Sequence, residues 1–177
     1  MEKRNANKTK TYLDAFDAYA DALYRHAFFR ISDGDRAHDL VQDAFVKTWQ
    51  YEERGGEILD YRAFLYRAIN NLIIDEYRRK KPISLDRILD EDNVPEGNFR
   101  ELVVESEQAL PQGVDHDELS LAMEKLPHQY KTAVTMRYLD ELSVQEISDI
   151  LGVNENIVSI QIYRGLKKLR SHLTQNT

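Results

Sequence analysis

One stretch of the chain combines cationic, amide and aromatic side chains in a way that suits a nucleic-acid strand. Cations neutralise phosphates, amides hydrogen-bond to base edges, and a ring gives an unstacked base a platform worth about 1 to 3 kcal/mol. The alternative is a solvated helix whose basic end complements its own dipole. We predict that the outward face of this helix carries Arg62, Tyr66, Arg67, Asn70, Asn71, Arg78 and Arg79.

A second set of residues, near the end of the chain, has the order of a helix-turn-helix. Ser143 and Glu146 have capping-box spacing, Gly152 supplies a left-handed turn residue, and Asn154 can cap the next helix. Such a pair places its second helix in the DNA major groove, whereas an ordinary helical hairpin is the alternative. The residues predicted to lie nearer the groove or to contact bases or phosphates are Asn154, Asn156, Ser159, Ile160, Gln161, Tyr163, Arg164 and Lys167. Those predicted to face the core are Val158, Ile162, Gly165 and Leu169.

Three apolar stripes at helical spacing can position the first set. One begins at Tyr12 and ends before the turn ISDGD; Asp33 or Asp35 can cap the second helix, and Asp60 the third. We find no alternating strand pattern and no hairpin signal. The inward positions of the three helices are Tyr12, Phe16, Tyr19, Leu23, Leu40, Val41, Ala44, Phe45, Thr48, Trp49, Phe64, Leu65, Ala68, Ile69, Leu72, Ile73 and Tyr77.

Charge is distributed unevenly along the 177 residues, whose formal net charge is −7. Residues 82–118 hold 11 acidic and 2 basic groups and three of the four prolines, a mixture that resists packing into a core. We therefore predict an all-α protein of two small helical domains, 1–81 and 119–177, joined by an acidic flexible linker, 82–118.

Several classes of protein are excluded by composition. The chain has no cysteine, so it has neither a disulfide framework nor a thiolate metal site. The five histidines lack metal-ligand spacing, and no phosphate-cradling loop or nucleophile elbow is present, so we expect no metal, no cofactor, no small-molecule substrate and no enzymatic activity. No run of about 18 apolar residues occurs and the start is polar, so we expect a cytoplasmic protein without membrane insertion.

Three segments in order, DLVQDAFVKTW, FLYRAINNLIIDEYRRK and the helix-turn-helix from LPHQYK onward, resemble bacterial RNA polymerase sigma factors of the extracytoplasmic-function (ECF) class. The resemblance implies that Asp39, Gln42, Asp43 and Lys47 bind a coiled coil of core RNA polymerase. It implies that the second segment recognises the -10 promoter element and captures a flipped base, with the loop YEERGGEI shaping the pocket. It also implies -35 recognition by the last domain, and an anti-sigma factor as a further partner.

The recognition helix departs from the family pattern. Where many relatives have Thr-Val-Lys-Ser-Arg, this chain has residues 157–161, Ile-Val-Ser-Ile-Gln, so two cations are absent. Each phosphate contact adds about one unit to the slope of the logarithm of the binding constant against the logarithm of salt concentration. Because two cations are absent, we expect weak binding to the -35 element that depends only lightly on salt. Two competing hypotheses are a helix-turn-helix regulator that binds DNA by itself and an adaptor that binds only protein. The linker is either an acidic strand on the RNA exit path or a plain tether.

Overall fold

The computed structural model describes residues 2–80, 103 and 113–174. The described residues are helical or lie in turns, with no strand among them, which confirms the predicted all-α class. The chain divides into two compact units, Met1–Lys80 and Lys81–Thr177. Most of the predicted acidic linker, 82–118, lies outside the described residues; of its end, His116 and the two residues after it already belong to a helix.

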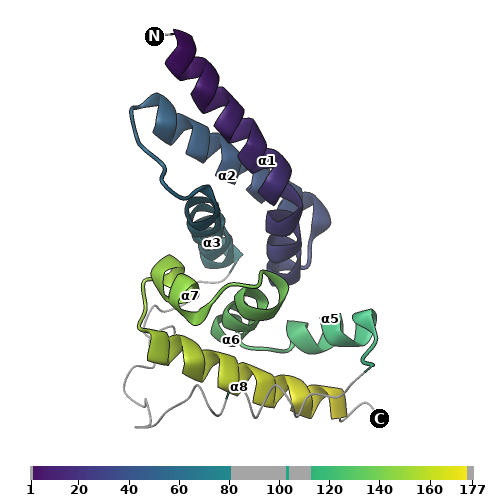
Figure 1. Cartoon of the computed structure of the whole chain (residues 1–177). Coiled ribbons are helices and arrows are strands. Elements are labelled where there is room, and N and C mark those ends of the chain that lie inside the picture. The colour runs from purple at the N-terminus through teal and green to yellow at the C-terminus, as the bar shows by residue number, and fades with distance from the viewer. Residues whose placement is uncertain (1, 81–102, 104–112, 175–177) are drawn as a thin grey trace. The chain divides into compact units, whose positions relative to one another are not determined.

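The first unit consists of three helices, α1 (Glu2–Ile31), α2 (Gly34–Glu53) and α3 (Tyr61–Lys80) (Figure 1). The turn after α1 places Ser32 at a positive φ of 54°. Of the two candidate caps for α2, Asp33 is the one used, since its side chain accepts a hydrogen bond from the amide of Arg36. Asp60 caps α3 as predicted, accepting from the amide of Ala63 at 3.1 Å.

The core of the first unit is formed by the predicted stripes. Helix α1 is 30 residues long, which exceeds the shorter helix expected. Its Phe16 remains 44% exposed, although its ring lies 4.9 Å from that of Phe45. Burial of each large apolar side chain stabilises the bundle by about 1.5 to 3 kcal/mol. The almost fully buried apolar residues are Leu23, Ala27, Ala37, Leu40, Ala44, Leu65, Ile69 and Ile73.

The second unit contains α5 (His116–Glu124), α6 (His128–Val134), a π-helical segment (Thr135–Leu139), α7 (Val144–Leu151) and α8 (Glu155–Thr174). The predicted helix-capping residues of this unit have the predicted conformations. Ser143 and Glu146 form a reciprocal capping box, with hydrogen bonds of 2.8 and 3.2 Å. Gly152 ends α7 at a φ of 68°, a left-handed conformation that only glycine adopts without strain.

Gly165 allows α6 and α8 to pack closely. A Cβ atom at this position would lie 2.6 Å from Cγ2 of Val134 and 3.3 Å from Cβ of Tyr130. The predicted core positions Val158, Ile162 and Leu169 are buried on α8. This packing holds α8, the second helix of the helix-turn-helix, against α6.

In the part of the chain that the structure describes, none of the helices is both long and apolar enough to cross a membrane.

Candidate nucleic-acid and polymerase interfaces

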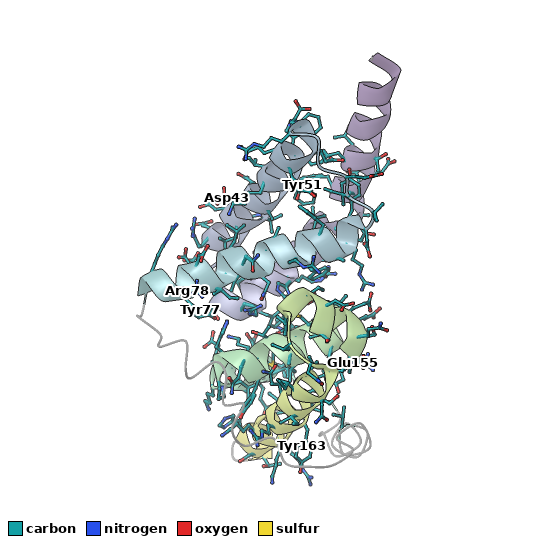
Figure 2. All side chains as sticks on the ribbon, turned by 90° about the vertical axis from the view of Figure 1, so that its left-hand side faces the viewer. Asp43, Tyr51, Tyr77, Arg78, Glu155 and Tyr163 are labelled. Atoms are coloured by element: carbon teal, nitrogen blue, oxygen red, sulfur yellow. The ribbon has the colours of Figure 1, made fainter. Side chains whose placement is uncertain are left out.

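The polar residues of α3 separate into an exposed stripe and a buried flank. Arg67, Asn71 and Arg78 follow one another at intervals of four and seven residues, so they fall on one side of the helix, and all three are exposed. Asp75 lies in the same stripe and forms an ion pair with Arg78 at 3.7 Å. Arg79 is also exposed, and Arg62 is half-buried. Figure 2 shows Arg78 on α3 and Asp43 on α2.

The predicted exposure of Tyr66 and Asn70 was wrong. Tyr66 is 2% and Asn70 is 3% exposed. The amide oxygen of Asn70 accepts a hydrogen bond of 3.0 Å from Nη1 of Arg30, and the ring of Tyr66 packs edge-on against His26 at 5.4 Å. Arg30 is only 1% exposed, so its guanidinium requires acceptors within the unit. Positions 66 and 70 are one turn apart and face α1 instead of solvent, Asn70 towards Arg30 and Tyr66 towards His26.

The predicted polymerase-binding face of α2 is exposed. Leu40, Ala44 and Phe45 are buried on the opposite side, as the periodicity required. The apolar Val46 is 51% exposed and lies between two of the predicted contacts. The four exposed polar residues of this face are Asp39, Gln42, Asp43 and Lys47.

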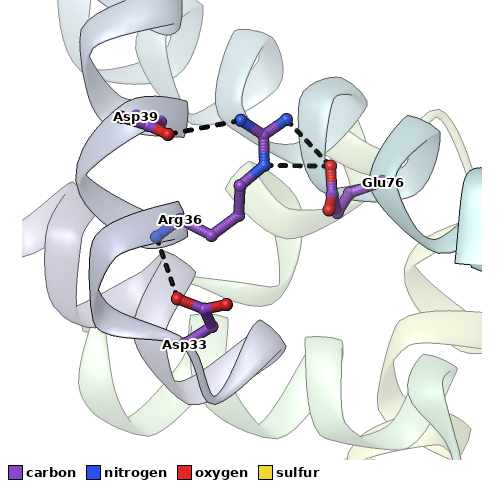
Figure 3. Close-up of polar contacts among 4 residues, drawn as sticks. All are labelled: Asp33, Arg36, Asp39 and Glu76. Carbon is purple, nitrogen blue, oxygen red and sulfur yellow. Dashed lines mark hydrogen bonds and ion pairs between the residues drawn. The ribbon is translucent and has the colours of Figure 1, made fainter.

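Arg36 connects α2 with α3 next to this face (Figure 3). Its Nε and Nη2 atoms lie 3.1 and 2.9 Å from Oε2 of Glu76, while Nη1 lies 3.6 Å from Asp39. The hydrogen bond with Glu76 is the main reason why the pKa of Arg36 is raised. This pair could not be predicted from a local sequence pattern, because its two residues lie 40 positions apart in the chain.

At the other end of the helix pair, a second contact connects α2 with α3. The hydroxyl of Tyr61 donates a 2.6 Å hydrogen bond to Glu52, which is 8% exposed. Burial, followed by this hydrogen bond and the charge of Glu52, raises the pKa of Tyr61. Burial also raises the pKa of Tyr12, whose hydroxyl donates to the carbonyl of Phe45. Sequence reasoning missed Glu52 and Tyr61; the only available signal was a carboxylate at a position facing the core.

Fewer of the residues predicted to face DNA on and before α8 are exposed than expected. Asn154, Asn156 and Lys167 are exposed, and Asn154 also caps α8 by accepting from the amide of Asn156 at 2.7 Å. Gln161, Tyr163 and Arg164 are half-buried.

The predicted exposure of Ser159 and Ile160 was wrong, since they are 2% and 4% exposed. The Ser159 hydroxyl donates to the carbonyl of Glu155 at 3.0 Å, so it is satisfied within its own helix. Ile160, an apolar side chain, gains free energy by leaving water.

The described residues contain no group of three or more His, Asp or Glu side chains arranged to hold a metal ion. The polar groups of the candidate interfaces on α2, α3 and α8 are mainly arginines, amides and carboxylates. Such groups can bind phosphates, base edges and a protein partner.

The chain matches two family models. Residues 15–83 match sigma-70 region 2, and residues 116–169 match sigma-70 region 4. These ranges contain α2 and α3 of the first unit and α5 to α7 of the second, with most of α8.

Similar proteins cover nearly the whole chain. ECF RNA polymerase sigma factor SigW of Bacillus subtilis is 32% identical over 168 residues, 92% of this chain and 88% of SigW. RNA polymerase sigma factor SigV of the same organism is 28% identical over 99% of this chain and 98% of SigV. The structure of the sigma factor RpoE in complex with the anti-sigma factor NepR from Bartonella quintana has a TM-score of 0.69 at 18% identity, covering 95% and 99% of the two chains, and is thus similar in fold. This chain belongs to the ECF family of RNA polymerase sigma factors and acts in transcription initiation.

Proposed function

We propose that the first unit brings the promoter to core RNA polymerase with two separate faces. The exposed face of α2, formed by Asp39, Gln42, Asp43 and Lys47, binds the polymerase. The exposed stripe of α3 binds the opened -10 strand through Arg67, Asn71 and Arg78, with Arg62 and Arg79 contributing positive charge. The observation that carries this proposal is the segregation of α3 into this stripe and a buried flank.

Strand opening follows from preferential binding to the separated strand. Arginines along α3 neutralise phosphates, and the amide of Asn71 can hydrogen-bond to a base edge. Extruding a base costs a few kcal/mol, which contacts in a pocket offset. Because Tyr66 and Asn70 are buried, they support the bundle and do not touch DNA in this proposal. The chain supplies binding free energy only, and RNA synthesis is carried out by the polymerase.

The second unit recognises the -35 element with α8. Among the predicted contacts, Asn154, Asn156 and Lys167 are exposed, and the half-buried Gln161, Tyr163 and Arg164 complete the face. Because only Arg164 and Lys167 among these contact residues are cations, the affinity of this face for duplex DNA is low and depends only lightly on salt. Recognition of the -35 element is therefore effective mainly when the polymerase carries both units to the promoter.

We also propose an anti-sigma factor as a partner. The similar RpoE structure was determined in complex with one, NepR. Since core polymerase is cytoplasmic, this chain works in the cytoplasm, and no small-molecule substrate or membrane insertion is part of the proposal. The acidic segment 82–118 either lies along the RNA exit path or acts as a plain tether, and replacing six of its acids by Gln or Asn separates these roles through the yield of abortive transcripts.

A regulator that binds DNA by itself is the less favoured alternative, because the region 2 match covers the first unit as well. The test is reconstitution with core polymerase and a library of promoter fragments. We expect selected run-off transcripts with polymerase and weak duplex binding without it. A strong footprint by the free chain on duplex DNA would contradict the proposal, and so would failure to bind core polymerase.

A further inference from the structure

One isoleucine of α8 is buried on the side of the helix that faces away from the core of its unit. Ile160 lies two residues from Val158 and two residues from Ile162, which are both 0% exposed. Because each residue turns an α-helix by about 100°, Ile160 lies on the opposite side of α8 from these two core positions. Its side chain is nevertheless only 4% exposed. The packing of the core therefore does not explain why Ile160 is buried.

The core side of α8 has clear packing partners on α5 and α6. Gly165, Leu169 and Leu173 continue the side of Val158 at helical spacing. A Cβ atom on Gly165 would meet Val134 of α6, and the two leucines share an apolar cluster with residues of α5 and α6. These contacts account for one side of α8, and Ile160 lies on the other.

The cover over Ile160 is local. On the same side of α8, Asn156 lies one turn earlier and Lys167 two turns later, and both are exposed. Next to Ile160, Arg164 and the Tyr163 labelled in Figure 2 are half-buried. The covered part of α8 thus coincides with positions predicted to contact the -35 element.

A residue of the acidic segment is also buried. Val103 is 7% exposed, and it belongs to the second compact unit, as α8 does. A buried side chain contacts several other residues, so Val103 has packing partners. Its neighbours in the sequence are acidic: Glu101, Glu105 and Glu107 lie within four residues of it, against the single cation Arg100. The segment therefore combines an apolar contact point with negative charge.

The outer side of α8 complements this segment in charge, and the segment can reach it. Residues 161–174 include four Arg or Lys and no Asp or Glu, and Lys167, Lys168 and Arg170 are exposed. The chain between Val103 and α5 can span about 40 Å, whereas the 20 residues of α8 extend over about 30 Å. Covalent attachment gives the segment a high effective concentration at α8.

We propose that in the free chain the acidic segment around Val103 packs over Ile160 and covers the DNA-facing side of α8. The inference rests on the proposed recognition of the -35 element by α8 and adds a control of that same site. Val103 and Ile160 form the apolar centre of the contact, and the acidic neighbours of Val103 face the cations of α8. Since DNA and the segment compete for one surface, the free chain binds the -35 element only during the fraction of time in which the segment is displaced.

The absence of cysteine from the chain makes this cover directly measurable. In the full chain, Ile160→Cys introduces a single thiol, whose rate of reaction with an aromatic disulfide reagent reports how often position 160 is open. Val103→Asp removes the apolar contact, and Glu101→Gln together with Glu105→Gln weakens the attraction without changing side-chain size. Asn156→Cys, one turn earlier and exposed, is the matched control thiol. Circular dichroism confirms that each variant is folded.

We expect Ile160→Cys to react about tenfold more slowly than Asn156→Cys in the otherwise unchanged chain. Val103→Asp should remove most of this difference, and the two Glu→Gln substitutions should remove part of it, while the rate of Asn156→Cys stays constant. Rapid reaction of Ile160→Cys in the unchanged chain would overturn the inference. A slow reaction that neither change of the segment accelerates would also overturn it, because another part of the chain would then be the cover.

DNA binding distinguishes this inference from the proposed function. The free chain with Val103→Asp and the native Ile160 should bind a duplex that carries the -35 element selected by the holoenzyme about tenfold more tightly than the wild type does. If Val103→Asp opens position 160 to the reagent and leaves the affinity for this duplex unchanged, the segment covers α8 as inferred. In that case it is the recognition of the -35 element by α8 that is contradicted.

Discussion

Arg36 near the start of α2 and Glu76 near the end of α3 form a two-donor ion pair at 2.9 and 3.1 Å (Figure 3). Together with Glu52 and Tyr61, which join the opposite ends of the same two helices, this pair fixes α2 against α3 at both ends. The proposed polymerase face and the proposed DNA stripe are therefore carried by one rigid helix pair.

Removing the charge of Glu76 tests the first of these contacts. Glu76→Gln should lower the free energy of unfolding by about 1 to 2 kcal/mol, because the side chains of Arg36 and Glu76 are only 29% and 12% exposed. Asp75→Asn is the control, since its pair with Arg78 is longer, at 3.7 Å, and about half exposed. This control should change stability by less than about 0.5 kcal/mol in denaturant titrations. Equal effects of the two substitutions would contradict the role of the Arg36–Glu76 pair.

Two adjacent asparagines on α3 should behave in opposite ways. Asn71→Ala should reduce strand opening by the holoenzyme and leave the thermal midpoint nearly unchanged, because Asn71 is exposed. Asn70→Ala should lower stability by about 1 to 3 kcal/mol, because it leaves the buried Arg30 without this acceptor. Permanganate footprints and melting curves on the same preparations separate the effects. A stable, opening-defective Asn70→Ala variant would show that the buried flank has been misassigned.

The half-buried Tyr77 should make the first unit sensitive to alkali. Burial raises the pKa of Tyr77 above its usual value of 10, so the native state keeps a proton that the unfolded chain loses above about pH 10. This contribution to stability is complete below pH 10 and is lost as pH rises through the native pKa. Tyr77→Phe should therefore be less stable than the wild type at pH 7 and lose stability less steeply above pH 10. Denaturant titrations at pH 7, 9 and 10.5 give the free energy of unfolding of both proteins. If it fell equally with pH in the wild type and in Tyr77→Phe, this assignment would be contradicted.

Close packing at Gly165 should be indispensable for the second unit. Gly165→Ala places a methyl group against Val134 and should destabilise the unit by about 1 to 3 kcal/mol, despite the better helix propensity of alanine. Ser171→Ala, at an exposed position of the same helix, should have little effect. Transcription from promoters that depend on the -35 element should fall with Gly165→Ala alone. Equal melting curves for the two variants would mean that α8 can move away from Val134 without loss of stability, which would contradict this prediction.

Local signals in the sequence predicted the fold well. Caps at Asp33, Asp60 and Ser143 depend on spacings of a few residues, and the left-handed Gly152 ends its helix as expected. The apolar stripes of α2 and α3 also identified the buried side, since helical periodicity alone determines which residues share a face. The exposed face of α2 followed directly from this pattern.

The candidate site was less predictable, because polar residues are not always outward. Tyr66 and Asn70 fall at the edge of the apolar stripe, and their partners lie on another helix: buried Arg30 donates to Asn70, and the ring of His26 packs against Tyr66. Ser159 was wrongly predicted to be exposed, because its hydroxyl hydrogen-bonds to a carbonyl of its own helix and does not need water. Glu52 and Tyr61 meet only through the tertiary arrangement of α2 and α3, which no sequence spacing reveals.

The most direct measurement is promoter opening by the reconstituted holoenzyme with Arg62, Arg67 and Arg78 together replaced by glutamine. Thymines that become reactive to permanganate report the separated strand. We expect the triple variant to bind core polymerase as the wild type does, yet to leave the -10 thymines unreactive. Full reactivity in the triple variant would contradict the assignment of strand capture to α3.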